Sequence, residues 1–359
     1  MKKKLILVWL TLLMVLFSSI SIYAEEDVQG DFFEKHVIIN GEEIINYNLQ
    51  YPFIMYNNIT YFPLSPEIQE ILGLDAEMDW ESRTLKLLKT DLTRKNISSN
   101  WMKNNNENVT LNVISEVKVL AFVPGGDDQN EDIGIIDTPE LSVTEIDLEG
   151  APLLAAGKFL YMPVRAMKDA DGFNWDIYFD PYYGLCISTE EGVSAESFCD
   201  KKEALRNKGL VAYIKSQNPA ITTTVAQQYL FLFKRASSVS GVKTEVLMAI
   251  ASKESHFNPW ATARGGARGM MQIMPATGAA YGLTADDLYD AKKNIDMGAV
   301  YVGERVRAYG GDVVKGLSAY NQGSAKVNRG THSTVYADRI IAENNRIGNY
   351  LTVNGYVAQ

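Results

Sequence analysis

The amino-acid sequence predicts a multidomain protein: an N-terminal α+β module built from a tandem repeat, followed by a C-terminal domain that is mainly α-helical. Three observations predict this. Residues 100 positions apart match in the N-terminal half, and apolar residues recur at helical spacing beyond residue 225. The charge also divides unevenly, with 16 basic and 34 acidic residues in 25–224 against 15 basic and 10 acidic in 225–359. Two modules with different partners would explain this division.

Composition narrows the functional classes. The chain has 359 residues, a net charge of −10 and 46% hydrophobic residues, which suits two or three globular domains. A nucleic-acid partner is not expected, because it would require a broadly basic surface. The two cysteines, Cys186 and Cys199, match no zinc spacing, so we expect no metal and no organic cofactor.

The first 24 residues have the pattern of a signal peptide. Three lysines at 2–4 precede an apolar run from Leu5 to Phe17, and the segment ends in Ser-Ile-Tyr-Ala at 21–24. The apolar run is shorter than the roughly 20 residues that a membrane-spanning helix needs. We expect cleavage after Ala24 and export of the remaining chain to the bacterial cell envelope, with an uncleaved anchor as the alternative.

Residues 25–200 form the predicted repeat module. Its copies span about 36–95 and 140–190. Each has a residue pair ending in glycine, a Tyr-x-Pro sequence, a helix-like segment, and strand-like alternation after an aromatic and acidic turn. The aligned positions are Pro52 with Pro152, Tyr61 with Tyr161, Pro63 with Pro163, Leu64 with Val164, Leu85 with Leu185, and Leu87 with Ile187. The polar stretch 96–135 is interpreted as an inserted loop or flexible region.

Three segments of the first copy carry a resemblance: Ile-Asn-Gly-Glu at 39–42, Tyr-Phe-Pro-Leu at 61–64 and Ala-Glu-Met-Asp-Trp at 76–80. They resemble the small domain found at the N-terminus of copper amine oxidases and in secreted bacterial cell-wall proteins. The resemblance implies an accessory module without copper or oxidase chemistry. Such a module could bind other cell-wall polymers or envelope proteins, or serve as a spacer.

Residues 201–224 are predicted to be a linker that begins with a charged helical stretch at about 201–215, and 225–359 a compact helical domain. Helices are expected near 225–240, 243–257, 294–309, 313–319 and 335–344. Within the second of these, Val242, Val246, Ile250 and Glu254 follow at intervals of four, which places an acid on the stripe that the helix buries. Desolvation raises the pKa of a carboxyl group, as a general acid requires, although a Glu at a frayed helix end could also reach solvent.

Several motifs follow Glu254 in order. They are Glu-Ser-His-Phe-Asn-Pro at 254–259, a glycine-rich stretch at 265–269, Met-Met-Gln-Ile-Met-Pro at 270–275, Asn-Ile at 294–295 with Gly298, and Ser-Ala-Tyr-Asn-Gln-Gly at 318–323. Together they resemble the soluble-type lytic transglycosylases, relatives of goose-type lysozyme, over residues 230–345. The resemblance implies a lysozyme-like fold and peptidoglycan glycan strands as the substrate.

The resemblance also implies roles for single residues. Glu254 would be the sole catalytic acid and base, and the substrate-binding residues would be Ser255, Gly269, Met271, Gln272, Tyr320, Asn321 and Tyr336. One position departs from the family, because a serine that some members carry nine residues after the Glu is Ala263 here. The methionines could equally be core residues, and Tyr320 and Asn321 could be ordinary helix-end residues.

The distribution of acids agrees with a single-acid mechanism. A two-carboxylate glycosidase needs a second Asp or Glu roughly 5–9.5 Å away, yet no acid occurs between Ser255 and Ala285. The next acids, Asp286, Asp287 and Asp290, are interpreted as the solvated face of a turn. The resemblance, with which this distribution of acids agrees, implies cleavage between MurNAc and GlcNAc with formation of 1,6-anhydro-MurNAc. A lysozyme-like hydrolase and a non-catalytic wall-binding protein remain the alternatives.

Overall fold

The computed structural model describes residues 27–90, 109–124, 141–168, 170–171 and 173–357. They divide into two compact units, one ending at Cys199 and the other beginning at Asp200. The predicted signal peptide lies outside the described residues. Among the helices that are described, none combines the length and hydropathy needed to cross a membrane.

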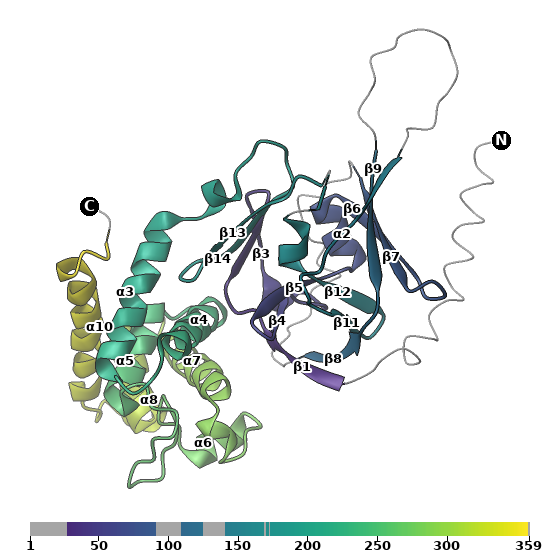
Figure 1. The fold of residues 1–359 in the computed structure, drawn as a ribbon. Helices are drawn as coiled ribbons and strands as arrows, with labels where there is room; N and C mark the ends of the chain where they lie inside the picture. The colour runs from purple at the N-terminus through teal and green to yellow at the C-terminus, as the bar shows by residue number, and fades with distance from the viewer. Residues whose placement is uncertain (1–26, 91–108, 125–140, 169, 172, 358–359) are drawn as a thin grey trace. The chain divides into compact units, whose positions relative to one another are not determined.

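The first unit is β-rich and contains a closed barrel and two four-stranded sheets, which Figure 1 shows as separate groups of strands. The barrel strands, in order, are β1 (Asp27–Phe32), β4 (Ile54–Tyr56), β5 (Ile59–Pro63), β12 (Phe159–Pro163), β11 (Leu153–Ala156) and β8 (Val109–Ile114). One sheet contains β10 (Leu141–Glu145), β9 (Lys118–Pro124), β7 (Thr84–Lys89) and β6 (Leu74–Asp79). The other contains β13 (Asp176–Asp180), β14 (Gly184–Ser188), β2 (His36–Ile39) and β3 (Glu42–Ile44).

The strand pairing relates the two halves of this unit by an approximate two-fold axis. In the antiparallel pair of β5 and β12, Tyr61 faces Pro163 and Tyr161 faces Pro63, so the two Tyr-x-Pro sequences are symmetry equivalents. The halves also exchange strands: β2 pairs in parallel with β14, and β7 pairs in parallel with β9. The repeat is therefore intertwined, whereas a tandem arrangement would keep each copy's strands together.

Two details of the predicted repeat are corrected. Residues 109–124, expected within an insert, form β8 and β9, which are equivalent to β1 and β2. β1 and β8 begin 82 residues apart, at 27 and 109, whereas β5 and β12 begin 100 apart, at 59 and 159. The change in offset hid the earlier strands from a comparison at one spacing. The rest of the expected insert, 96–108 and 125–135, lies outside the described residues.

The two Asx/Glu-Gly pairs are also not equivalent. Both have positive φ at both residues, at Asn40-Gly41 and at Glu149-Gly150, which is a conformation that glycine and asparagine tolerate. The first pair connects β2 to β3, whereas the second lies between β10 and β11. The sequence pattern therefore identified a shared local turn geometry at two different places in the topology.

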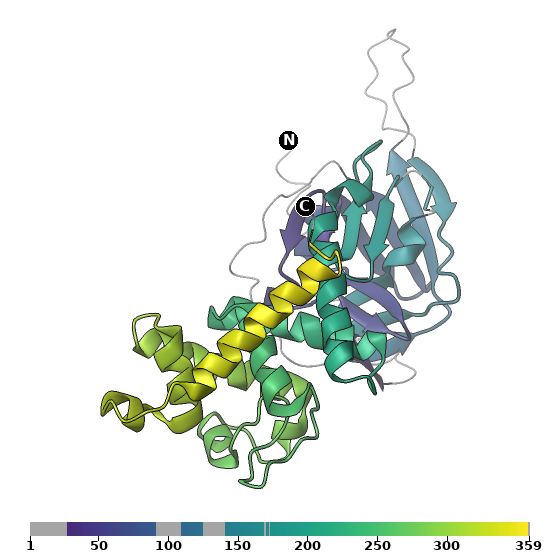
Figure 2. The ribbon, with the colours of Figure 1, turned by 90° about the vertical axis from the view of Figure 1, so that its left-hand side faces the viewer.

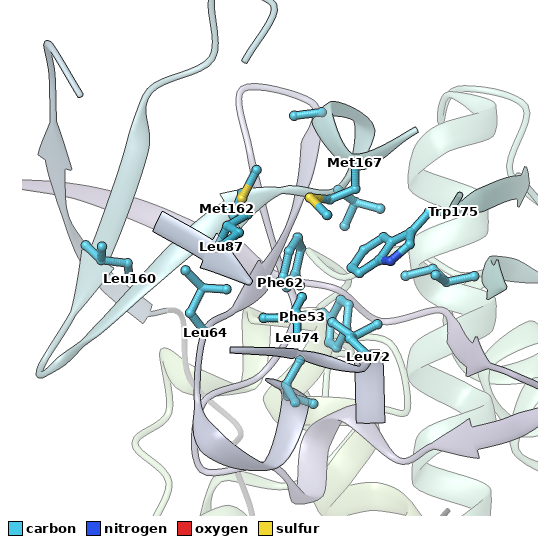
Figure 3. Close-up of a cluster of buried hydrophobic side chains, with 14 of the residues drawn as sticks. Phe53, Phe62, Leu64, Leu72, Leu74, Leu87, Leu160, Met162, Met167 and Trp175 are labelled. Atoms are coloured by element: carbon cyan, nitrogen blue, oxygen red, sulfur yellow. The ribbon is translucent and has the colours of Figure 1, made fainter. Parts of the chain in front are cut away.

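Alternating side chains of β5 and β12 enter two hydrophobic clusters. Tyr61 and Tyr161 belong to the smaller cluster. Phe62 and Met162 belong to the larger one, where the ring of Phe62 lies 5.6 Å from that of Trp175. Figure 3 shows the larger cluster, with side chains from both halves of the repeat. Helix α2 (Pro66–Leu72) contributes to it, and the unit also contains the 3-10 turns η2 (Asn46–Asn48), η4 (Val164–Met167) and η5 (Ala195–Phe198).

The second unit is helical. Its elements are α3 (Lys201–Gln217), α4 (Thr223–Ser240), α5 (Thr244–Ser255), α6 (Pro275–Ala280), η6 (Asp287–Tyr289), α7 (Ala291–Ala308), α8 (Val313–Gln322), α9 (Ser324–Asn328) and α10 (Val335–Val353). All five expected helices are present. Helix α10, the long yellow helix of Figure 2, extends nine residues beyond its expected end, because Ile347 and Leu351 continue its buried stripe.

The charged helical stretch expected at about 201–215 is present, but it belongs to the helical unit and not to a linker. Residues 201–217 form α3, which packs against α4 and α10 within the helical unit. Asp200 caps this helix by accepting hydrogen bonds from the amides of Lys202 and Glu203, at 2.9 and 3.0 Å. The helical unit thus begins about 25 residues earlier than expected, and only the short segment between α3 and α4 connects as a linker would.

Candidate active site

Glu254 lies in the last turn of α5 and is half-buried. Burial raises the pKa of its carboxyl group above the usual value of 4.5. A contact with the hydroxyl of Tyr336 and the positive charge of Arg339, both on α10, oppose this shift without cancelling it. Glu254 is therefore held in a setting that favours the protonated form, as proton donation requires.

Two tyrosines from different helices border this carboxyl group. The negative charge of Glu254 contributes to pKa values of Tyr320 on α8 and Tyr336 on α10 that lie well above 10, with burial as the larger cause. Their rings stack at 6.3 Å between centroids. Among the described residues, the Tyr336 hydroxyl oxygen has no partner at full hydrogen-bonding geometry, so it is available beside Glu254. Both phenols stay neutral at any physiological pH.

A compact segment, residues 268–273, holds Tyr320 in place. The hydroxyl of Tyr320 donates to the carbonyl of Met271 at 2.8 Å. The amide of Met271 in turn donates to Oδ1 of Asn294 on α7 at 2.7 Å, and the amide group of Asn294 donates to Leu288 O and Arg268 O. Asn294 is fully buried. A chain of short contacts thus runs from Asn294 through the Met271 backbone to the tyrosine beside Glu254.

The conformation of residues 268–273 depends on close packing. Gly269 has φ +79°, and a Cβ atom there would lie 1.9 Å from the carbonyl oxygen of Leu288. Only glycine fits this position without displacing the backbone. Gln272 also has positive φ, and its side-chain amide donates to the carbonyls of Gly269 at 2.8 Å and Ala261 at 3.1 Å. These two residues fix the shape of the segment.

Met271 and Ser255 help to hold the segment 268–273 against the neighbouring helices. The Met271 side chain is fully buried and packs against Gly298, where a Cβ would lie 2.6 Å from its sulfur. It has no exposed surface to offer a ligand, which favours the interpretation of this side chain as core. The hydroxyl of Ser255 donates to Met270 O at 2.7 Å and joins the end of α5 to the same segment.

The structure therefore brings together part of the predicted site. The carboxyl group of Glu254 lies beside the side chains of Tyr320 and Tyr336. The residues that form the framework behind them are Ser255, Gly269, Met271 and Gln272. Asn321 lies exposed in the last turn of α8. His256, which follows the last residue of α5, is also exposed and has φ +52°.

The three acids at 286–290 each have a structural partner. Asp286 is 93% exposed at its side chain and lies 3.1 Å from the guanidinium of Arg268. Asp287 pairs with Lys293 at 2.5 Å, and Asp290 caps α7 by accepting from the Lys293 amide at 2.9 Å. This agrees with their interpretation as a turn. The groups that shift the pKa of Glu254 are Tyr336 and Arg339, with no carboxylate among them.

Sequence reasoning missed a second buried acid, Glu343 on α10, whose side chain is 2% exposed. It accepts hydrogen bonds from the hydroxyls of Tyr213 and Ser252, and pairs with Lys253 at 2.8 Å and Arg346 at 3.1 Å. Ser252 and Lys253 immediately precede Glu254, so this cluster anchors the end of α5 to α10. In the described part of the chain, no group of three or more His, Cys, Asp or Glu side chains could hold a metal ion.

Part of the helical unit is similar to a known domain family. The family model for the Transglycosylase SLT domain matches residues 231–340. Three relatives are 34% identical to this chain over the aligned residues, which make up about 30% of the chain. They are Membrane-bound lytic murein transglycosylase C of Edwardsiella ictaluri, aligned over 120 residues, Peptidoglycan transglycosylase gp16 of Escherichia phage T7, over 108, and Transglycosylase of Enterobacteria phage PRD1, over 106.

The residues that the family model matches, 231–340, lie within the helical unit. The chain covers 33%, 8% and 39% of the three relatives' own lengths. Among solved structures, the 70 kDa soluble lytic transglycosylase of Escherichia coli is 23% identical, covering 43% of this chain and 32% of that one, with a TM-score of 0.28. The lytic transglycosylase Slt of Pseudomonas aeruginosa is 21% identical, covering 44% and 32%, with a TM-score of 0.32.

Proposed function

We propose that this chain is a secreted peptidoglycan lytic transglycosylase that cleaves the β-1,4 bond between MurNAc and GlcNAc and forms 1,6-anhydro-MurNAc. The observation that carries the proposal is the half-buried Glu254, whose pKa is raised by burial and which is bordered by Tyr320 and Tyr336 rather than by a second carboxylate. The match of residues 231–340 to the SLT domain supports the same reaction.

In the proposed mechanism Glu254 acts twice. The protonated carboxyl group first donates its proton to the glycosidic oxygen, and the bond between this oxygen and C1 of MurNAc breaks. The resulting carboxylate then accepts the proton of the 6-hydroxyl group as O6 attacks C1 of the same sugar. The protons balance, Glu254 returns to its starting state, and water is not consumed.

The surrounding residues would serve this step in two ways. Tyr336, whose hydroxyl faces Glu254, would stabilise the carboxylate between the two proton transfers, because it lowers the pKa of that group. Tyr320 is fixed by its bond to Met271 O and would line the glycan site. Ser255, Gly269, Met271 and Gln272 would hold this arrangement, and Asn321, at the exposed end of α8, would contact the glycan.

The β-rich unit would be an accessory module, as its resemblance to the copper amine oxidase N-terminal domain implies. We propose that it places the helical unit at the cell wall, by binding a wall polymer or an envelope protein, or as a spacer. The signal peptide expected at residues 1–24 would deliver the chain to the cell envelope. No metal or organic cofactor takes part in the proposed reaction.

Mass analysis of fragments released from purified peptidoglycan tests the proposal. Residues 25–359 should release fragments ending in 1,6-anhydro-MurNAc, and Glu254→Gln should release none. Glu245→Gln is the matched control, because it makes the same change in the first turn of the same helix. Reducing ends would instead indicate a lysozyme-like hydrolase. If residues 25–359 bound peptidoglycan without releasing fragments, the chain would be a wall-binding protein.

A further inference from the structure

Trp260 is an unusually exposed aromatic side chain, with 72% of its surface accessible. It lies in the turn that follows α5, six residues after Glu254. The side chain is stacked on Tyr289 of η6, with 5.9 Å between ring centroids and 25° between ring planes. Trp260 is therefore part of an accessible surface of two aromatic rings rather than an isolated exposed side chain, and such surfaces can mark binding sites.

Three contacts hold the Trp260–Tyr289 pair in place. The Tyr289 hydroxyl is within 2.7 Å of the Thr262 hydroxyl, and the guanidinium of Arg268 lies 5.3 Å from the Tyr289 ring centre. The backbone amide of Trp260 donates to Oδ1 of Asn258 at 3.0 Å, which fixes the turn. A flat aromatic surface that is ordered before binding loses little conformational entropy when a ligand covers it.

Two open clefts flank the indole. One has a volume of about 470 Å³ and includes Gln217, Asn218, His256 and Asn258, along with Ser255 at the end of α5. The other has a volume of about 620 Å³ and includes Tyr229, Tyr289, Asp286 and Asp290. Among the described residues that line these clefts, none is Lys or Arg. The lining thus combines aromatic faces with neutral amides and carboxylates.

We propose that the Trp260–Tyr289 pair is a sugar-stacking site that holds an uncharged N-acetylhexosamine ring of a glycan strand. A pyranose presents an apolar face of C–H groups to the indole and a rim of hydroxyl and acetamido groups to the amides and carboxylates beside it. An acidic peptide or an anionic polymer fits poorly, because the described lining offers no Lys or Arg to pair with its charges, the charge of Arg268 is already balanced by Asp286, and Asp290 would repel it. The choice of glycan rests on the proposed function.

Binding of N-acetylglucosamine hexasaccharide to full-length Glu254→Gln protein tests this site without turnover. In that background, Trp260→Ala should weaken binding at least fivefold in calorimetry, and Trp260→Phe should stay within threefold because it keeps a stacking face. Trp260 is the sole tryptophan in residues 200–359, the others being at 9, 80, 101 and 175. Hexasaccharide should therefore change the fluorescence of the parent but not that of Trp260→Phe.

Val239→Ala is the control for a general loss of exposed apolar surface, because Val239 is 55% exposed on α4. Its affinity should equal that of the parent. Unchanged affinity in Trp260→Ala, or an equal loss in Val239→Ala, would overturn the assignment. A Trp260-dependent loss seen with peptide-bearing peptidoglycan but not with hexasaccharide would also overturn it, in favour of a peptide site.

The two proposals can fail separately. If anhydro fragments form but Trp260→Ala binds hexasaccharide normally, the stacking site is wrong and the reaction stands. If no anhydro fragments form but hexasaccharide binding depends on Trp260, the reaction is wrong and the stacking site stands.

Discussion

The Glu343 cluster gives a quantitative prediction for the stability of the helical unit. Glu343→Gln keeps the size of the side chain but removes the charge that Lys253 and Arg346 neutralise. Removing one partner of a buried ion pair costs about 3–5 kcal/mol. The side chains of Lys253 and Arg346 are 29% and 53% exposed, so solvent compensates part of this loss. We expect the free energy of unfolding to fall by roughly 2–3 kcal/mol at pH 7.

The pH dependence adds a second test. Burial alone would raise the pKa of Glu343, but the hydrogen bonds from Lys253, Tyr213 and Ser252 outweigh it and lower the pKa below 4.5. A carboxyl group whose pKa is lowered by folding stabilises the protein above its unfolded pKa, and this stabilisation disappears as pH falls through the folded value. The difference between wild type and Glu343→Gln should therefore be constant near neutral pH and shrink below about pH 4.5.

Urea unfolding followed by circular dichroism at the helical band measures this difference, because helices occur mainly in the second unit. Asp338→Asn, on the exposed face of α10, is the control and should change stability by no more than about 0.5 kcal/mol. The reasoning would be refuted if Glu343→Gln unfolded within about 0.5 kcal/mol of wild type at pH 7. It would also be refuted if the difference persisted unchanged at pH 3.

Three further predictions concern the site. Arg339→Met removes a positive charge that lowers the pKa of Glu254, so Glu254 should stay protonated to higher pH. The alkaline limb of the kcat/KM profile should therefore move to higher pH, and a shift to lower pH would contradict this. Gly269→Ala places a methyl group against Leu288 O and should lower the free energy of unfolding by about 2–4 kcal/mol in a denaturant titration, whereas wild-type stability would contradict the close packing. Ala263→Ser should raise turnover of peptidoglycan if the family's serine supplies a missing hydrogen bond, and unchanged turnover would mean that the site compensates.

The helices of the second unit could be predicted because their signal is local. Apolar residues at helical spacing predicted all five longer helices beyond residue 225. Six charged residues in 201–215 favour the interpretation of this stretch as part of a linker, although Leu210, Val211 and Ile214 of α3 are buried. That α3 belongs to the helical unit shows only in its packing against α4 and α10, which no local window contains.

The strand exchange of the first unit could not be read from the sequence. Hairpins such as β6–β7 and β13–β14 join neighbouring segments through short turns, and the sequence indicated the turn of each hairpin and the strand-like alternation after it. The parallel pairs join distant segments: Leu185 faces Val37, and Leu85 faces Val119. Nothing local specifies such pairing, so similarity between the copies indicated duplication without revealing which strands they exchange.

Glu254 could be found in the sequence because it lies on a buried helical stripe. Glu343 follows the same rule, since Ile340, Glu343 and Ile347 are all buried at helical spacing on α10. Applying the pattern to every predicted helix would have revealed it, had the expected helix not ended at residue 344. Tyr320 and Tyr336 are different, because only the resemblance suggested that residues on α8 and α10 meet at Glu254.

The origin of the oxygen atom that becomes bonded to C1 of MurNAc in the product tests the central claim most directly. Purified peptidoglycan would be digested by residues 25–359 in water labelled with oxygen-18, and the fragments analysed by mass. If O6 of MurNAc attacks C1 under the control of Glu254, the fragments should end in 1,6-anhydro-MurNAc and contain no oxygen-18. Reducing ends carrying one oxygen-18 atom would show that water attacks C1, and would contradict the single-acid intramolecular mechanism.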